Sequence, residues 1–262
     1  MFTRLRTTIS ECYAFREVLF NILSQDLKVK YKRTFLGYLW SLLNPVLQLA
    51  VLTAVFSHVV RLGMKDYTLY LFSGLLVWTF FQTTTTAAST ALLENENFIK
   101  KVYLPKMLFP LSKLCLKAID FVFSLVALSV IGAVLGFHFH ATVIYLPAAI
   151  LIFFTFTLGM AISLSILTVF FRDIQYLLNV FLQLLYFLTP IIYPISALPD
   201  EYRRYLNLNP LVPEILLFQK LIYYGEFPTG MEWGVAAGLA LVSIAIGWIL
   251  LNLFEEDLVF RM

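Results

Sequence analysis

Six long apolar stretches divide the chain, and no other feature of the sequence limits its fold as strongly. A helix crosses the bilayer when it supplies about 20 apolar residues, because each residue adds ~1.5 Å against roughly 30 Å of hydrocarbon. Stretches of that length cover residues 38–60, 69–92, 117–136, 144–170, 174–193 and 233–254. Charged residues make up only 13% of the 262 positions, whereas soluble domains carry about a quarter. The sequence therefore predicts an all-α polytopic membrane protein with six transmembrane helices.

The placement of lysine and arginine predicts how these helices are oriented. Most of these residues fall in segments 1–37, 93–117 and 171–173, which share one side of the membrane if all six stretches cross it. Cytoplasmic segments carry the excess of basic residues, so we expect this side, and both termini, to be cytoplasmic. The chain then divides into an N-terminal cytoplasmic segment, 1–37, and a six-span transmembrane domain, 38–262.

The N-terminal segment combines an apolar stripe with a basic run. Its apolar residues recur at helical spacing at Phe15, Val18, Leu19, Ile22 and Leu23, and the basic run at 28–33 follows. This pattern predicts an amphipathic helix on the inner leaflet, with its cations near anionic head groups of the membrane lipids. Alternatively, the basic run only fixes the topology of the first span.

A charge pair, Arg172-Asp173, sits where the fourth stretch meets the fifth. It marks the inner interface of the membrane, or else it forms a hinge or a docking contact. With the N-terminal basic run, it completes the set of residues that we assign to the inner-face interface: Asp26, Lys28, Lys30, Tyr31, Arg33, Arg172 and Asp173.

The loop between the second and third stretches, 94–106, mixes acids and bases with isolated large apolar residues. This mixture predicts a short interfacial helix, which Pro105 ends or bends. A plain cytoplasmic loop has little use for exposed apolar side chains, so we favour docking of a partner. The residues expected to take part are Glu94, Glu96, Phe98, Ile99, Lys100, Lys101, Tyr103 and Leu104.

On the outer side, one long connection, 195–232, joins the fifth and sixth stretches. Within it, residues 211–224 are apolar but interrupted by Pro213, Glu214 and Lys220, and about 14 residues are too few to cross. We expect one or two short helices that lie in, or dip into, the outer interface, with an ordinary ordered loop as the alternative.

Several kinds of chemistry find no support in the sequence. No G-x-x-x-x-G-K-[ST] motif occurs, so the chain has no P-loop for nucleotide phosphates. His138 and His140 lack the further ligands that a structural metal site needs, and we predict no metal site and no catalytic residues. Cys12 and Cys115 are expected to be free thiols at the cytoplasmic side. No basic patch points to nucleic acid.

Asp120 lies near the inner end of the third stretch. Lys113 and Lys117 fall on the same helical face, seven and three residues before it. An ion pair with these lysines reduces the cost of burying the carboxylate. A role for Asp120 in an intramembrane proton relay is the less favoured alternative.

Aromatic residues make up 16% of the chain. Interfacial belts and core packing account for most of them. Aromatic faces also let a sugar chain slide by stacking on its apolar C–H surfaces. As a hypothesis, we assign this glycan path to Tyr38, Trp40, Trp78, Phe81, Tyr186 and Tyr193.

Four stretches resemble a known family. They are DLKVKYKRTFLGYLWSLLNP (26–45), NENFIKKVYLPKMLFP (95–110), FFRDIQYLLNVFLQ (170–183) and LTPIIYPISALPDEYRRYLNLNPLVP (188–213). Their order and spacing resemble the permease subunits of bacterial polysaccharide ABC exporters, which move lipid-linked O-antigen, capsule or teichoic acid across the inner membrane. Gln25 departs from the arginine that relatives often carry there, which puts a charge-based role at this position in doubt.

The resemblance implies an ATP-driven exporter of a polyprenyl-linked polysaccharide, with O-antigen as the first expectation. It implies a homodimer docked on two copies of a separate ATP-binding subunit, which binds ATP and Mg²⁺, so that this chain needs no cofactor of its own. The N-terminal helix becomes an interface helix, loop 94–106 a coupling loop, and segment 195–232 a periplasmic gate. Three alternatives stay open: a permease for a small molecule such as a drug or haem, an intramembrane enzyme acting on lipid-linked sugars, and a passive channel.

Overall fold

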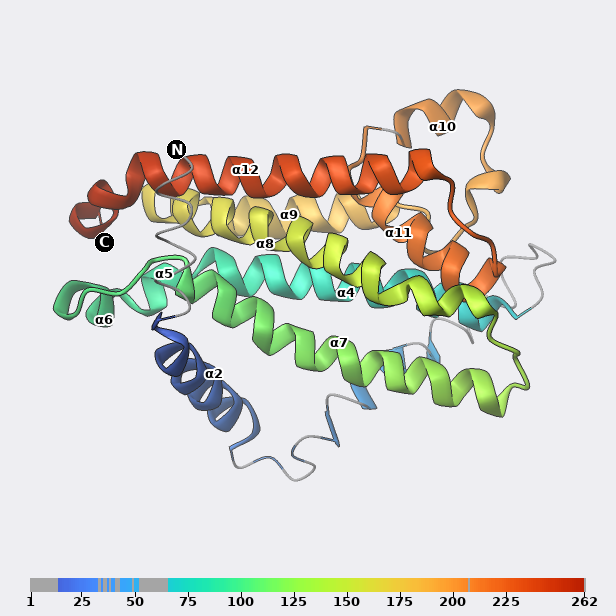
Figure 1. The fold of residues 1–262 in the computed structure, drawn as a ribbon, viewed down its shortest axis with the longest axis horizontal. Helices are drawn as coiled ribbons and strands as arrows, with labels where there is room; N and C mark the ends of the chain where they lie inside the picture. The colour runs from blue at the N-terminus through green and yellow to red at the C-terminus, as the bar shows by residue number, and fades with distance from the viewer. Residues whose placement is uncertain are drawn as a thin grey trace.

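The computed structural model describes residues 14–32, 34, 37, 39–40, 43–48, 50–51, 66–206 and 208–261. These residues form helices and their connections, without a strand, so the expected all-α fold is confirmed. Five helices run side by side along the long axis of the molecule (Figure 1). They are α4 (Tyr67–Ser89), α7 (Leu108–Val134), α8 (Leu146–Phe170), α9 (Ile174–Phe187) and α12 (Gly230–Arg261).

Shorter elements gather at the two ends of this bundle (Figure 1). At one end lie α5 (Ala91–Glu94), α6 (Glu96–Lys101) and the C-terminal end of α12, with α2 (Arg16–Tyr31) set at an angle against α7. At the other end lie α10 (Asp200–Leu206) and α11 (Leu211–Gln219). The elements expected on the cytoplasmic side thus share one end, and the expected outer segment lies at the other.

Within the described residues, three segments are long and apolar enough to cross a membrane: Leu108–Val134, Ala141–Phe170 and Gly230–Leu258. The second includes the 3₁₀ turn η1 (Ala141–Tyr145) that precedes α8. These helices confirm a polytopic membrane protein. Most of the first expected span, 38–60, lies outside the described residues, so the count of six stays a prediction.

The fifth expected span, 174–193, is wrong in its length. Helix α9 ends at Phe187 after 14 residues, which reach only about 21 Å. Pro190 explains the end, because it lacks an N–H and disfavours helical geometry in the residue before it. The chain then turns within the bundle, where the single proton of the Tyr70 hydroxyl is shared between the carbonyl oxygens of Pro190 (3.0 Å) and Tyr193 (2.8 Å).

Helix α4 forms the centre of the bundle and packs against α7, α8, α9 and α11. It carries no charged residue, and most of its residues are buried. Its hydroxyl groups are largely satisfied within the helix itself: Thr85 donates to the carbonyl of Phe81 at 2.7 Å, and Thr83 to that of Thr79 at 2.8 Å. Such bonds let polar side chains stay inside an apolar bundle without an external partner.

Helices α8 and α12 make the most extensive contact between two helices. At their closest approach, a Cβ added to Gly159 would lie 2.3 Å from the backbone carbon of Ser243. The Ser243 hydroxyl donates to the carbonyl of Phe156 at 2.8 Å. Small residues in both helices therefore allow their backbones to touch, as in other membrane helix pairs.

The expected short helices on the outer side are present, and α11 is buried in the bundle. Leu211, Ile215 and Phe218 are fully buried, with the Phe218 ring edge-on to those of Phe121 and Phe153. The five-residue π-helical turn η3 (Lys220–Tyr224) follows α11 directly. This segment dips between the long helices and does not lie along their surface.

The carboxyl group of Glu214 in α11 is fully buried, and neither of its oxygens has a hydrogen bond within the described residues. We expect Glu214→Leu to stabilise the chain by about 1–3 kcal/mol, because a buried unsatisfied polar group costs about that much. Thermal unfolding of the purified protein in detergent checks this, with Glu201→Leu in exposed α10 as the control. A lower melting temperature for the Glu214 variant would mean that the carboxyl group has a stabilising partner.

Candidate functional site

At the end of the bundle that carries α2, α5 and α6, the N-terminal helix lies close to the loop that follows α4. Phe15, Val18 and Ile22 pack against an apolar cluster that includes Ile99 of α6 and Leu258 of α12. The apolar stripe expected to face the lipid therefore contacts protein as well. α2 itself has no fully buried residue, so it rests on the bundle as a surface element.

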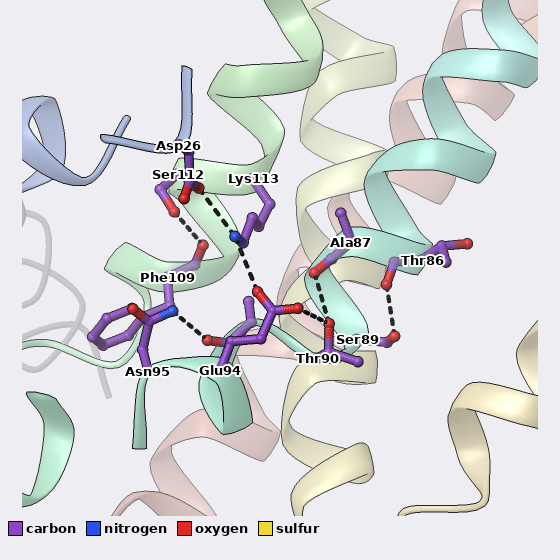
Figure 2. Close-up of polar contacts among 11 residues, drawn as sticks. Asp26, Thr86, Ala87, Ser89, Thr90, Glu94, Asn95, Phe109, Ser112 and Lys113 are labelled. Atoms are coloured by element: carbon purple, nitrogen blue, oxygen red, sulfur yellow. Dashed lines mark hydrogen bonds and ion pairs between the residues drawn. The ribbon is translucent and has the colours of Figure 1, made fainter. Parts of the chain in front are cut away.

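Lys113 of α7 is the hub of a charge network at this end (Figure 2). Its ammonium group lies 3.0 Å from Asp26 Oδ2 of α2 and 3.1 Å from Glu94 Oε2 of α5. Glu94 Oε1 also accepts a hydrogen bond of 2.6 Å from the Thr90 hydroxyl. The Lys113 side chain is only 12% exposed, so one largely buried cation connects three helices.

A second bridge lies further along the same two helices. Lys30 of α2 donates to Asp120 of α7, with Nζ–Oδ distances of 2.5 and 2.8 Å. Burial alone would lower the pKa of Lys30, but its contacts with Asp120 and Tyr31 outweigh this and raise the pKa above the ordinary value. Asp26 and Lys30 are one helical turn apart, so both face α7.

The expectation that Lys113 pairs with Asp120 is wrong. Lys117 does approach Asp120, at 4.0 Å, but Lys113 lies two helical turns away and pairs with Asp26 and Glu94. These carboxylates come from other helices, which local helical spacing cannot reveal.

The apolar docking residues expected in loop 94–106 fall into two groups, one buried and one exposed. Ile99 and Leu104 are buried, and they anchor the loop in the apolar cluster that also contains Leu258. Phe98 and Tyr103 are more than half exposed, and so is their neighbour Val102, which was not among the expected residues. Exposed neighbouring apolar side chains at the tip of a protein are typical of a surface that a partner covers.

The remaining charged residues that were expected to form the docking loop or the inner-face interface stay at the surface. Lys100 pairs with Glu96 at 2.6 Å on the exposed side of α6, and Lys101 is exposed as well. Lys28 is exposed on α2, while Arg172 and Asp173 are exposed in the turn between α8 and α9. Arg33 lies outside the described residues.

A second candidate site is a groove of about 940 Å³ between α4, α9 and the described residues of segment 44–51, with both polar and apolar side chains in its lining. Trp78 and Tyr186, both expected on the glycan path, line it with their ring centroids 5.3 Å apart. The Trp78 indole N–H donates to Gln82 Oε1 at 3.0 Å. The structure thus brings two expected aromatic residues to one wall of the groove.

The other expected aromatic residues do not line this groove. Phe81 is buried and stacks on Phe156 between α4 and α8, with ring centroids 5.8 Å apart. Tyr193 lines a smaller apolar pocket and donates to the carbonyl of Phe187 at 2.9 Å. Trp40 is half exposed, and Tyr38 lies outside the described residues.

Sequence reasoning missed the carboxamide side chains of the groove. They are Asn44, Gln48, Gln82, Asn179 and Gln183. Two pairs, Asn44–Gln48 and Asn179–Gln183, are spaced four residues apart within apolar stretches. This spacing puts both members on one helical face, which is a signal that the sequence already contains.

Comparison with known proteins places the chain among membrane transporters. The sequence model of the family described as ABC-2 type transporter matches residues 17–223. A Myxococcus xanthus protein named O-antigen export system permease protein RfbA is 32% identical over 250 residues, which cover 95% of each chain. A Klebsiella pneumoniae protein of the same name is 30% identical over 80% of this chain and 81% of that protein. The Escherichia coli polysialic acid transport protein KpsM is 23% identical over 88% of this chain and 91% of that protein.

Proposed function

Because the chain belongs to the ABC-2 type transporter family, we propose that it is the transmembrane subunit of an exporter that moves lipid-linked polysaccharide across the bacterial inner membrane. The observation that carries this proposal is the similarity to an O-antigen export permease over 95% of both chains. A second relative is named for polysialic acid transport. Both names favour a glycan as cargo over a drug or haem.

The energy for transport comes from a separate ATP-binding subunit, as membership of an ABC-2 family implies. ATP and Mg²⁺ then bind to that partner, two copies of which serve two copies of this chain. The exposed apolar residues Phe98, Val102 and Tyr103 supply a docking surface for the partner. When the partner moves this surface, the ion pairs of Lys113 with Glu94 and Asp26 transmit the movement to α7 and α2, because they connect these helices.

The glycan passes along the groove between α4, α9 and residues 44–51. A long polymer cannot be enclosed in one closed cavity, so it needs a continuous path at a subunit interface. Helix α9 supports a homodimer, since its apolar residues Leu177, Val180, Phe181 and Leu184 share one helical face and are more than half exposed. A second copy that covers this face would close the groove into a conduit.

Charge placed on the docking surface is expected to release the ATP-binding subunit. In Phe98→Asp and Tyr103→Asp, loss of an exposed aromatic contact should weaken association about tenfold or more, as for interface anchor residues. Co-purification of the partner from detergent-solubilised membranes measures this. Asn97→Asp adds the same charge to exposed α6 at a residue that is already polar, and we expect it to retain the partner. Normal recovery with both aromatic variants would contradict this docking surface.

Deletion of the gene tests the export function in the cell. Lipid-linked glycan should then accumulate on the cytoplasmic face of the inner membrane, and surface glycan should be lost. Complementation with the wild-type gene should restore surface glycan. Normal surface glycan in the deletion strain would contradict the proposal.

A further inference from the structure

The described residues that line the groove between α4, α9 and segment 44–51 are all uncharged. Five carry carboxamides, and the rest are Leu47, Val51, Trp78, Thr79, Thr83, Tyr186 and Phe187. Its volume of about 940 Å³ lies near the top of the range of about 300–1,000 Å³ for ligand pockets. The groove can therefore hold a substantial ligand, but the part of its lining that the structure describes offers no charge to pair with that ligand.

The helices that frame the groove carry no counter-charge either. Neither α4 (Tyr67–Ser89) nor α9 (Ile174–Phe187) contains a lysine, arginine, aspartate or glutamate. The Lys113 network lies at the inner end of the bundle and is already paired with Asp26 and Glu94. A carboxylate that enters a low-dielectric path without a cation beside it has a large desolvation penalty.

The carboxamides offer both donors and acceptors of hydrogen bonds. Gln82 accepts the Trp78 indole N–H through Oε1, which leaves its amide N–H groups to donate into the groove. Asn179 donates through Nδ2 to the carbonyl of Gln175 at 2.9 Å, which leaves its Oδ1 to accept. Sugar hydroxyl groups both donate and accept, so they match this lining, while the rings of Trp78 and Tyr186 suit apolar C–H faces.

We propose that the groove selects a glycan whose repeat units are uncharged and disfavours a polyanionic glycan. This inference rests on the proposed export function, which it narrows to one class of cargo. The acceptor oxygens of the groove would repel a carboxylate, and its amide donors are neutral and cannot replace a lysine or arginine. Polysialic acid, the cargo in the name of the E. coli relative, belongs to the disfavoured class.

Transport by the complete complex tests this selection. The chain and its ATP-binding subunit are reconstituted in lipid vesicles with one of two polyprenyl-linked glycans of equal length, a neutral mannose polymer or a sialic acid polymer. ATP-dependent movement is read from protection of the glycan against an external glycosidase. We expect at least about a tenfold faster movement of the neutral polymer, because an unpaired charge in a low-dielectric path costs more than that factor.

Two groove variants then test where the selection arises. Gln82→Lys and Gln183→Lys place a cation in the groove. We expect each to reduce the ratio of the neutral-polymer rate to the sialic-acid-polymer rate about tenfold. The control Gln175→Lys adds the same charge to α9 outside the groove lining, and it should leave the preference unchanged. An equal change in the control and the groove variants would contradict the role of the groove.

The comparison of the two polymers with the wild-type complex distinguishes failure of the proposed selection from failure of the proposed export function. Equal or faster movement of the sialic acid polymer would overturn the selection for uncharged glycans while leaving the export function intact. Absence of ATP-dependent movement of both polymers would contradict the export function itself, and the inference with it.

Discussion

Gly159→Leu is expected to prevent α8 and α12 from packing and to abolish stable folding of the chain. A Cβ on Gly159 would lie within 2.3–2.5 Å of the backbone at Ser243 and Ile244, which is closer than real contacts allow. Backbone atoms of a helix cannot rotate away as a flexible side chain can, so the two helices must separate. Overpacking costs about 1–3 kcal/mol at many sites and more where the backbone must move.

The yield of monodisperse protein after detergent extraction, and its melting temperature, measure this effect. Gly238→Leu is the matched control, because it lies in the same helix pair and nothing approaches its Cβ position within 4 Å. We expect the control to be recovered like the wild type. Equal recovery of the Gly159 variant would show that α8 and α12 do not pack backbone to backbone.

Lys113→Glu is expected to uncouple the chain from its ATP-binding subunit and to reduce export at least about tenfold. The substitution would place three carboxylates, at positions 26, 94 and 113, around a point that now holds one cation. Loss of the pairing costs about 1–3 kcal/mol once screening at half-exposed Glu94 is taken into account. The lost free energy weakens the contacts that α2 and α5 make with α7.

Surface glycan per unit of membrane-inserted protein measures this effect. Lys113→Arg keeps the charge and should retain most export. Combining Asp26→Lys with Lys113→Glu restores one ion pair with reversed polarity, and we expect partial recovery of export. Full export from Lys113→Glu alone would contradict the proposed path of coupling through Lys113.

Hydropathy predicted the long helices well where they are apolar throughout, and poorly where tertiary contacts neutralise charge. The end of α8 at Phe170 agrees with the prediction. Helix α7 begins at Leu108, nine residues before the predicted start at 117, because Lys113 and Lys117 find carboxylate partners that allow the helix to continue. Helix α12 continues past the apolar stretch to Arg261, since a helix need not end where its sequence becomes charged.

The burial of α11 could not be predicted from its sequence. Its residues are as apolar as those of an interfacial helix, and only the packing of Phe218 against Phe121 and Phe153 distinguishes the two cases. Sequence also suggested that Trp78 and Phe81 share a role. Residues three positions apart in α4 instead point toward different neighbours, since Trp78 meets Tyr186 of α9 and Phe81 meets Phe156 of α8.

The charge network was visible in the sequence only as separate parts. Asp26, Glu94 and Lys113 lie in three segments separated by tens of residues. Their residue types identify an inner-face surface, but their pairing depends on the angle at which α2 crosses α7. This information belongs to the tertiary structure and has no local sequence signal.

ATP-dependent movement of a lipid-linked glycan tests the central claim most directly. The chain is reconstituted in vesicles with the neutral polyprenyl-linked polymer, either alone or together with its ATP-binding subunit. We predict that the glycan reaches the opposite leaflet only when both proteins and hydrolysable ATP are present. Movement of the glycan by the chain alone, at the same rate with and without ATP, would contradict the claim that this protein is the membrane subunit of an ATP-driven exporter.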